Sequence, residues 1–503
     1  MAKKPFIDRA IATVSPGWAL TRERARLRLT MAERVRAEYN GASQSRRAAN
    51  WRRTRNDANN ELNPRVQAAL REVSRDLVRN NPWAHRALHA WANNLVGTGI
   101  TFQVYRNGKV DDKLNALARS FFDTTACDAN GMFDLYGLQL QAAKSIVEGG
   151  AVLARRRWRR ASDGLPVPFQ IQLLEPDYLD PGKNGTLNAR NANGPYAING
   201  IEFSPLGKRE AYWLYSGHPG GMRATNGSTR VPAADVIHCY RADRIEQEHG
   251  ATWFAPVIAK LADFADYDDA QLMRQKIAAC FSVFKISDEE GIETSLSADS
   301  ADVEELEPGL IHDLKPGQDI KFASPPGVDG FGDYSKVSLQ AVSTGLNLPY
   351  FVLTGDLSAF NFSSGRMGWL EFQRSLSALQ WSMFIPQFCR GLERWFLQAL
   401  AIQGVNVDGV SMEWTPPRRE MISPETEIPA IRDAIRSGQM TISEAAKARG
   451  VDPDVFFAEW KADAEKLDAL ELIFDSDPRR VTAVGNPTSS GPTSPAAKQG
   501  GNT

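Results

Sequence analysis

The sequence predicts an α+β protein that is mainly helical. Through most of the chain, apolar residues recur at three- and four-residue spacing, which is the period of amphipathic helices. Between residues 165 and 250, short apolar or alternating runs are bounded by Pro, Gly and Asn, which is typical of strands. With 503 residues, 42% of them hydrophobic, the chain is too long for one ordinary core. We therefore expect two to four domains or an elongated subunit.

Arginine dominates the N-terminal region. Residues 21–60 hold eleven Arg and four acidic residues, although the whole chain has a net charge of −1. Any contact with nucleic acid must therefore come from local patches. Residues 1–59 are either a flexible, solvated arm or a basic arm that lies on nucleic acid or on an acidic neighbouring subunit. The residues that would make such contacts are Arg46, Arg47, Arg52 and Arg53.

Helices alternate with one strand in the region that follows. Pro64 can open a first helix, and the breaker Asn-Asn-Pro at 80–82 ends it. A second helix is predicted at 83–95, before a glycine turn at 97–99. The next elements are a strand at 100–105 and helices at 114–122 and 135–147.

Five arginines surround one tryptophan in the run RRRWRR at 155–160. Strand alternation places Arg155, Arg157 and Arg159 on one face, and Arg156, Trp158 and Arg160 on the other. Guanidinium groups pair with phosphate in a fork, and an indole can stack on a base. A charged patch between subunits fits the run equally well. Both interpretations stay open, and the candidates for contact are Arg155, Arg157 and Arg159.

A polar insertion separates two helical regions in the centre of the chain. The helix before it is expected at 254–284, with the acidic run DYDD at 266–269 as a solvated face. Residues 286–309 hold nine acidic residues and no basic one, and short strands and turns follow. This composition is too polar for a large core, so we expect a small module that projects between two helices.

The second helical region contains an irregular segment at 348–366. Ser363 and Ser364 fit the cap of a helix that starts at Arg366, because a serine side chain accepts a free backbone N–H at a helix start. A long aromatic-rich helical stretch follows, which we expect Pro386 to break. Most of its rings fit a local core, and the rest fit a subunit interface.

The C-terminal part is helical and amphipathic from 425 to 474. A turn is expected at Gly450, and Asp452 with Pro453 can open the last helix. After Asp477 the composition becomes low-complexity, which predicts disorder.

Patterns that catalysis or metal binding would need are missing from the sequence. It has no phosphate-binding loop and no HExxH motif. His85 and His89 could share a helix face, but no carboxylate lies between them and no third ligand is nearby. His238 and Cys239 are neighbours on a predicted strand, so they point to opposite faces and cannot easily pair as base and nucleophile. We therefore predict no catalytic residue, no metal site and no cofactor.

The four cysteines lie far apart and form no CxxC pair, which argues against a zinc ribbon or a disulfide scaffold. They fit a reducing cytoplasm. No run of 18 apolar residues occurs, so no membrane contact is expected.

Four segments carry a more specific pattern. In chain order they are YNGASQSRRAANWRRTRNDANNEL with LVRNNPWA and NNLVGTGI; LLEPDYLD with VIHCYRADRIEQEHGATWFAPVI; LNLPYFVLTGDLSAFNFSSGRMGWLEFQR; and IRSGQMTISEAAKARGVDPDVFFAEW. Between about residues 39 and 460, the chain resembles the lambda-like family of bacteriophage portal proteins.

The resemblance implies a portal fold with wing, stem, clip and crown regions, assembled as a ring at one capsid vertex. The regions would be a wing at 60–253, a stem helix at 254–284, a clip at 285–332, a second stem helix at 333–347, a tunnel loop at 348–366, wing helices at 367–425, a crown at 426–475 and a disordered tail at 476–503. The candidates for lining the tunnel are Asn347, Asp356, Ser358, Asn361, Ser363, Ser364 and Arg366.

The resemblance also implies partners. A ring of twelve subunits would let double-stranded DNA pass during packaging and ejection, and would contact the terminase large subunit, the major capsid protein and a head–tail adaptor protein. It would assemble in the host cytoplasm and end in the virion. The packaging ATPase would be a separate chain, because no phosphate loop occurs here. DNA must pass without being gripped, and a tunnel segment with Asp356 and a single Arg366 suits weak contact.

Two alternative functions belong to other classes of protein. One is another DNA-binding head protein or minor capsid protein. The other is a packaging-associated nuclease or protease, which would need an acid/base or metal set. Rings with a central hole in negative stain separate a portal from both, and a nuclease assay with Mg²⁺ tests the enzyme directly.

Overall fold

The computed structural model describes residues 56–187, 194–222, 227–279, 283–287, 318–322, 330–358, 361–417, 421, 423–472, 474 and 479. The chain divides into two compact units, Met1–Asp57 and Ala58–Thr503, and the elements below belong to the second. Of the predicted arm, only residues 56–59 are described, and Arg46, Arg47, Arg52 and Arg53 lie outside them. Of the predicted tail, only Arg479 is described.

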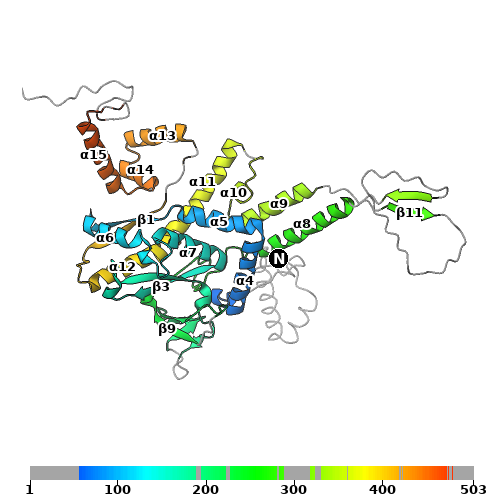
Figure 1. Ribbon diagram of the computed structural model, residues 1–503, viewed down its shortest axis with the longest axis horizontal. Helices are drawn as coiled ribbons and strands as arrows, with labels where there is room; N and C mark the ends of the chain where they lie inside the picture. Colours follow the sequence, from blue (N-terminus) through cyan, green and yellow to red (C-terminus); the bar gives the residue numbers. More distant parts are fainter. Residues whose placement is uncertain are drawn as a thin grey trace, which may run out of the picture. The chain divides into compact units, whose positions relative to one another are not determined.

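The fold is mixed α and β and mainly helical, as predicted (Figure 1). The helices are α3 (Ala58–Glu61), α4 (Pro64–Asn80), α5 (Pro82–Val96), α6 (Asp112–Phe122), α7 (Leu135–Gly149), α8 (Ile258–Ala279), α9 (Phe331–Gly345), α10 (Tyr350–Thr354), α11 (Phe362–Leu379), the π-helix η7 (Gln380–Cys389), α12 (Arg390–Ile402), α13 (Pro424–Arg436), α14 (Ile442–Ala448) and α15 (Pro453–Ala469).

The strands pair in antiparallel fashion, in the sheet orders β13-β1-β2, β10-β3-β4, β11-β12 and β5-β6-β7-β8-β9. Their bounds are β1 (Thr101–Arg106), β2 (Lys109–Val110), β3 (Ala151–Trp158), β4 (Phe169–Leu174), β5 (Gly185–Thr186), β6 (Tyr196–Ile198), β7 (Ile201–Phe203), β8 (Arg209–Tyr215), β9 (Ser228–Pro232), β10 (Val236–Tyr240), β11 (Val283–Ser287), β12 (Gln318–Phe322) and β13 (Val410–Thr415).

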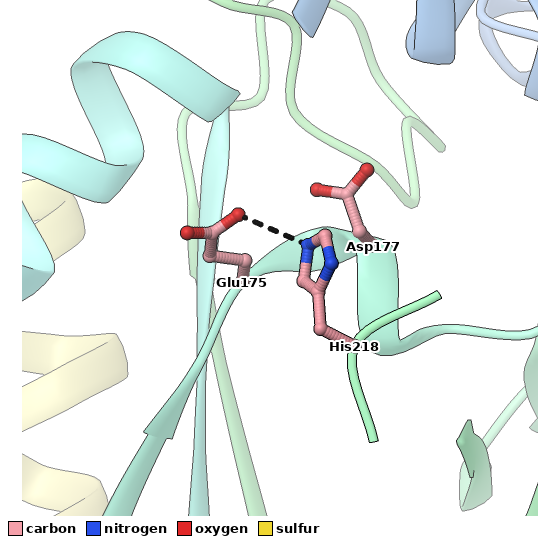
Figure 2. A group of neighbouring side chains, drawn as sticks. All are labelled: Glu175, Asp177 and His218. Carbon is pink, nitrogen blue, oxygen red and sulfur yellow. Dashed lines mark ion pairs between the residues drawn. The ribbon is translucent and has the colours of Figure 1, made fainter. Parts of the chain in front are cut away.

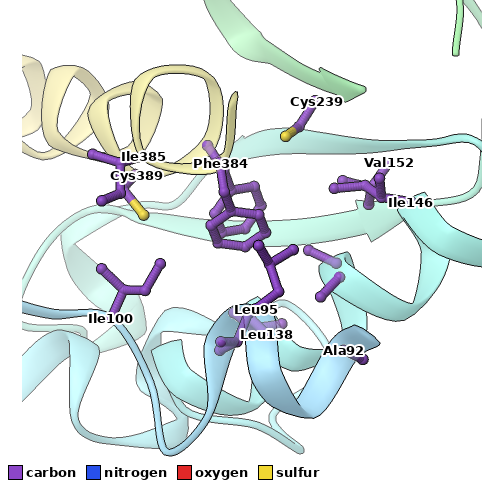
Figure 3. Close-up of a cluster of buried hydrophobic side chains, with 14 of the residues drawn as sticks. Ala92, Leu95, Ile100, Leu138, Ile146, Val152, Cys239, Phe384, Ile385 and Cys389 are labelled. Atoms are coloured by element: carbon purple, nitrogen blue, oxygen red, sulfur yellow. The ribbon is translucent and has the colours of Figure 1, made fainter. Parts of the chain in front are cut away.

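Strand β3 separates two hydrophobic clusters. Val152 and Ala154 belong to the large cluster with α5, α7, η7 and α12, whereas Leu153 belongs to the smaller cluster with the five-stranded sheet. Figure 3 shows part of the large cluster, where Phe384 of η7 points toward Leu95 of α5. The two faces of β3 therefore point into different surroundings, as strand alternation requires.

The break at 80–82 is confirmed, and a single residue organises it. Asn81 follows the last residue of α4, and its side-chain oxygen accepts the N–H groups of Trp83 (3.0 Å) and Ala84 (3.2 Å) at the start of α5. Pro82 stands at the first helical position, where its missing N–H costs nothing. The predicted use of the rings on the long aromatic stretch as a core is also confirmed, because Phe384, Phe388 and Trp395 are fully buried.

Three predicted boundaries were wrong. The helix predicted to reach residue 284 ends at Ala279, and β11 begins at Val283, where a partner strand supplies its hydrogen bonds. Pro386 does not break its helix, because the chain passes it inside the wider turns of η7. The region 367–425, predicted as helices, contains β13, which pairs with β1 over its whole length.

Candidate functional site

The predicted tunnel segment starts from a firmly held end of α9. Leu346 and Leu348 are buried, and the indole Nε1 of Trp91 donates to the carbonyl oxygen of Leu346 over 3.0 Å. Between these two leucines, Asn347 is exposed and has φ +53°. That left-handed conformation is one that asparagine tolerates better than most residues. The turn therefore presents the Asn347 side chain outward.

The segment after Asn347 is not the continuous loop that was predicted at 348–366. Residues 350–354 form the short helix α10, and Leu353 anchors it in the core. Arg86 on α5 donates from Nε to the carbonyl oxygen of Val352 over 3.1 Å. The first part of the segment is therefore fixed to the body by a buried leucine and a side chain from another helix.

Asp356 and Ser358 form one tight turn after α10. The backbone N–H of Ser358 donates to Asp356 Oδ1 over 2.9 Å. Hydrogen bonds from the side chain and backbone of Ser358 lower the pKa of Asp356. Asp356 is therefore a carboxylate at neutral pH, and the turn offers negative charge to its surroundings.

The helix predicted to start at Arg366 starts four residues earlier. Asn361 is its N-cap and accepts from the backbone N–H of Ser364 over 2.8 Å, while the Ser364 side chain accepts from the N–H of Asn361 over 3.2 Å. Ser364 is thus part of the cap, as predicted, but as the third helical residue. Asparagine is one of the preferred N-cap residues. In the sequence, Asn361 followed three positions later by Ser364 is the pattern that could have identified this helix start.

Arg366 contacts a different part of the chain from the other tunnel candidates. It lies 3.8 Å from Glu427 on α13, measured from Nη2 to Oε1. The structure therefore brings together Asp356 with Ser358 and Asn361 with Ser364, whereas Arg366 joins α11 to a C-terminal helix. Ser363 is exposed on the first turn of α11.

The arginine run lies on β3 with the predicted alternation. Arg155, Arg157 and Arg159 follow the side of Leu153 and are half-buried to exposed. Arg157 donates from Nε to Gln172 Oε1, and Arg159 donates from Nε to Gln170 Oε1, both over 2.7 Å.

Arg156 points to the opposite side and has a structural role that the sequence did not reveal. Its guanidinium lies 2.6 Å from Asp235 Oδ1 and 2.6 Å from Gln398 Oε1 on α12. It also stacks over the rings of Trp158 and Trp395, at 4.3 and 5.6 Å from their centroids. With 5% of its side chain exposed, Arg156 is a buried clamp between β3 and α12.

One cluster has the composition of a metal site. Figure 2 shows Glu175, Asp177 and His218, whose possible ligand atoms all lie within 4.8 Å of one another. Arg75 pairs with both carboxylates, and Arg71 lies 3.3 Å from Asp177. Burial works to raise the pKa of Asp177, but Arg71 and Arg75 hold it below its usual value. The carboxylates are already neutralised by guanidinium groups, so the cluster acts as an ion-pair network that ties α4 to the turn after β4.

The buried thiol of Cys239 is unsuited to nucleophilic chemistry. Burial raises its pKa, so it remains a thiol at neutral pH. His238, its neighbour on β10, has its ring against Tyr212, Tyr240 and His249. Among the helices of the described residues, none has the length and hydropathy that crossing a bilayer requires.

Comparison with known proteins gives one family. The family model described as "Phage portal protein, lambda family" matches residues 44–380. The chain is 23% identical over 430 residues to a "Probable portal protein" of Halomonas phage phiHAP-1, covering 80% of this chain and 81% of that protein.

The solved structures that the chain matches are more distant in sequence. A chain from the neck of a native gene transfer agent particle, computed with C12 symmetry, is 14% identical, with 78% of this chain and 95% of that chain covered and a TM-score of 0.45. An HK97 family phage portal protein from Corynebacterium diphtheriae is 10% identical, with 70% and 95% covered and a TM-score of 0.33. The family match spans well over half of the residues, and the chain belongs to the lambda family of phage portal proteins, which are structural components of the virion and not enzymes.

Proposed function

We propose that copies of this chain close into a ring at one capsid vertex, and that double-stranded DNA passes through the ring during packaging and ejection. The observation that carries the proposal is a pair of packed helices on either side of a small inserted module. Tyr267 on α8 lies 4.3 Å from Tyr334 on α9, measured between ring centroids. The hairpin β11–β12 belongs to the stretch that separates them in sequence. This arrangement fits two stem helices and a clip.

The charge on α8 suits a channel that does not hold DNA. Asp263, Asp266, Asp268 and Asp269 are exposed, and none of them forms an ion pair among the described residues. If α8 faces the bore, these carboxylates repel DNA phosphates. Repulsion repeated around a ring disfavours long-lived contacts, so the duplex can slide.

An exposed apolar stripe on α11 and η7 suits contact between neighbouring copies. Met367, Leu370 and Trp381 are 70%, 39% and 56% exposed, at spacings of three and eleven residues. Such spacings place residues on nearly the same side of a helix. Side-by-side closure of a ring requires an interface of this kind on every subunit.

Assembly of the full-length chain tests the proposal. Sedimentation and negative-stain imaging should give rings with a central hole. Trp381→Glu should shift the protein to smaller, folded species, because a carboxylate would be buried between copies. Leu206→Glu is the matched control, since Leu206 is 96% exposed in a turn of the five-stranded sheet, and it should leave the rings intact. A wild-type chain that stays monomeric at high concentration contradicts the proposal.

The finer assignments belong to the same proposal. Twelve subunits are the expected copy number. The wing would comprise 60–253 and 367–425, the stem α8 and α9, the clip 285–332 and the crown α13 to α15. Residues 347–366 would line the tunnel. The ring would be a docking site for the terminase large subunit, sit in the shell of the major capsid protein and carry the head–tail adaptor. Co-sedimentation with each purified partner tests these contacts one at a time.

A further inference from the structure

Beyond the buried Leu153, the same face of β3 carries a ladder of guanidinium groups. Arg155 and Arg157 lie two residues apart on the strand, which spaces their Cα atoms by about 6.7 Å, and Arg159 follows one residue after the strand ends. On β4, Gln172 lies opposite Arg155 and Gln170 lies opposite Arg157. We name these five residues the arginine ladder.

The glutamines hold the guanidinium groups in one orientation. Gln170 Nε2 donates to the carbonyl oxygens of Ala126 (3.1 Å) and Asp128 (2.9 Å), which directs its Oε1 toward Arg159. Gln172 Oε1 accepts a hydrogen bond from Arg157 Nε. Among the described residues, no hydrogen bond occupies the Nη nitrogens of Arg157 and Arg159. Their forks are therefore held in place and open to a ligand.

Positive charge on the ladder is not neutralised by direct ion pairs within the described part of the chain. None of the three arginines forms an ion pair there, whereas Arg156 pairs with Asp235 and Arg209 with Glu248. Burial lowers the pKa of Arg155 and Arg157, and a neighbouring arginine lowers each further, although nearby Asp235 partly offsets this at Arg155. An anion bound on this face would relieve that repulsion.

We propose that the arginine ladder binds the phosphate backbone of nucleic acid, with successive guanidinium forks on successive phosphates and no reading of base sequence. The inference rests on the proposed function, which brings duplex DNA to the assembled ring. Guanidinium forks match phosphate oxygens in geometry, and release of counterions supplies the affinity. Reading of base edges needs an element that enters a DNA groove, whereas these side chains stand on the face of a strand pair.

An acidic protein segment is the competing ligand, and the composition of the face argues against it. A stable protein interface needs an apolar centre with aromatic anchors. The ladder offers only guanidinium and amide groups. The nearest large apolar side chain on the strand, Trp158, belongs to the opposite face, where Arg156 covers its ring.

Duplex binding by the assembled protein tests the inference. Fluorescence anisotropy would follow two labelled 30-bp duplexes of unrelated sequence over a series of salt concentrations. The variant Arg157→Gln with Arg159→Gln removes two forks and keeps polar side chains. Its matched control is Arg79→Gln with Arg119→Gln, since both residues are exposed and lie on α4 and α6, away from the stripe on α11. Both variants lose the same charge.

The ladder variant should bind both duplexes more weakly, and the slope of log affinity against log salt should fall by about two. The control should keep the wild-type slope. If the double variant does not fold, Arg159→Gln alone should lower the slope by about one. An unchanged slope overturns the inference. The inference is also overturned if the ladder variant loses binding to labelled poly-L-glutamate but still binds the duplexes as the wild type does. That result would assign the ladder to an acidic protein. Rings in negative stain for every variant separate these outcomes from a failure of the proposed function.

Discussion

Trp91 on α5 donates its indole N–H to the carbonyl oxygen of Leu346, at the end of α9, over 3.0 Å. Trp91 is 1% exposed, and its ring lies edge-on to Trp253 and Phe372. The bond joins the core of the body to the residue that precedes the tunnel segment. The orientation of that segment therefore depends on a contact between residues 255 positions apart in sequence.

Trp91→Phe should destabilise the protein by about 1–3 kcal/mol beyond the cost of the smaller ring, because the buried carbonyl of Leu346 loses its donor. Trp253→Phe is a matched control. Trp253 is equally buried, but its Nε1 has no hydrogen-bond partner among the described residues. Denaturant unfolding of both variants measures the difference. Equal losses of stability would show that the Trp91 bond contributes nothing specific.

Arg156→Met should destabilise by about 3 kcal/mol. Removing one partner of a buried ion pair typically costs about 3–5 kcal/mol, and the remaining Asp235 is partly exposed, which favours the lower end. Arg374→Met gives the surface comparison, because Arg374 and Glu371 are 79% and 72% exposed and such pairs contribute about 1 kcal/mol or less. Thermal unfolding compares the two, and a loss at Arg156 no larger than at Arg374 would contradict the role of a buried clamp.

Local signals in the sequence predicted the elements whose ends are fixed locally. The break at 80–82 follows from one asparagine and one proline, and the alternation of Arg155 and Arg156 follows from the strand period. The strand β13 was missed, although Val410, Met412 and Trp414 alternate with polar residues. Its partner β1 lies about 300 residues earlier, and such a pairing leaves no mark in a short window.

Residues of the candidate site also differ in whether their partners are local or distant in sequence. Asn361 and Ser364 form a local cap, which spacing alone could have identified. The partners of Arg156 and Arg366 come from distant segments, at Asp235 and Glu427. No rule of spacing pairs these residues, because burial and packing of other elements bring them together.

Substitutions at Asn347 should show whether backbone conformation or side-chain chemistry stabilises the turn before the tunnel segment. Its φ of +53° is costly for a β-branched residue, so Asn347→Val should destabilise by about 1–2 kcal/mol. Asn347→Gly should leave stability nearly unchanged, since glycine adopts this conformation freely. Chemical denaturation of both variants provides the measurement. Similar losses for Val and Gly would mean that the side chain, not the backbone, sets the stability of the turn.

Two buried histidines near β10 predict sensitivity to acid. Burial lowers the pKa of His249 to about 4, with a further lowering by Arg209 and Arg71 that a bond to the Ile198 carbonyl opposes. Burial also puts the pKa of His238 well below its ordinary value, and Arg209 and His249 lower it further. Neither ring nitrogen of His238 has a hydrogen-bond partner among the described residues. Tyr212 and Tyr240 complete the surroundings of this ring.

Both histidines are neutral in the folded chain and bind protons more readily once it unfolds. Their contribution to the free energy of unfolding is complete above pH 6.5 and is lost progressively as the pH falls below 6.5, for His249 until about pH 4. For His249 the full loss is about 3 kcal/mol. Melting temperatures measured between pH 7.5 and 4.5 should therefore fall more steeply for the wild type than for His249→Gln. If the curve of His249→Gln is as steep as that of the wild type, the acid sensitivity arises from other groups, since removal of a buried neutral imidazole must flatten the curve.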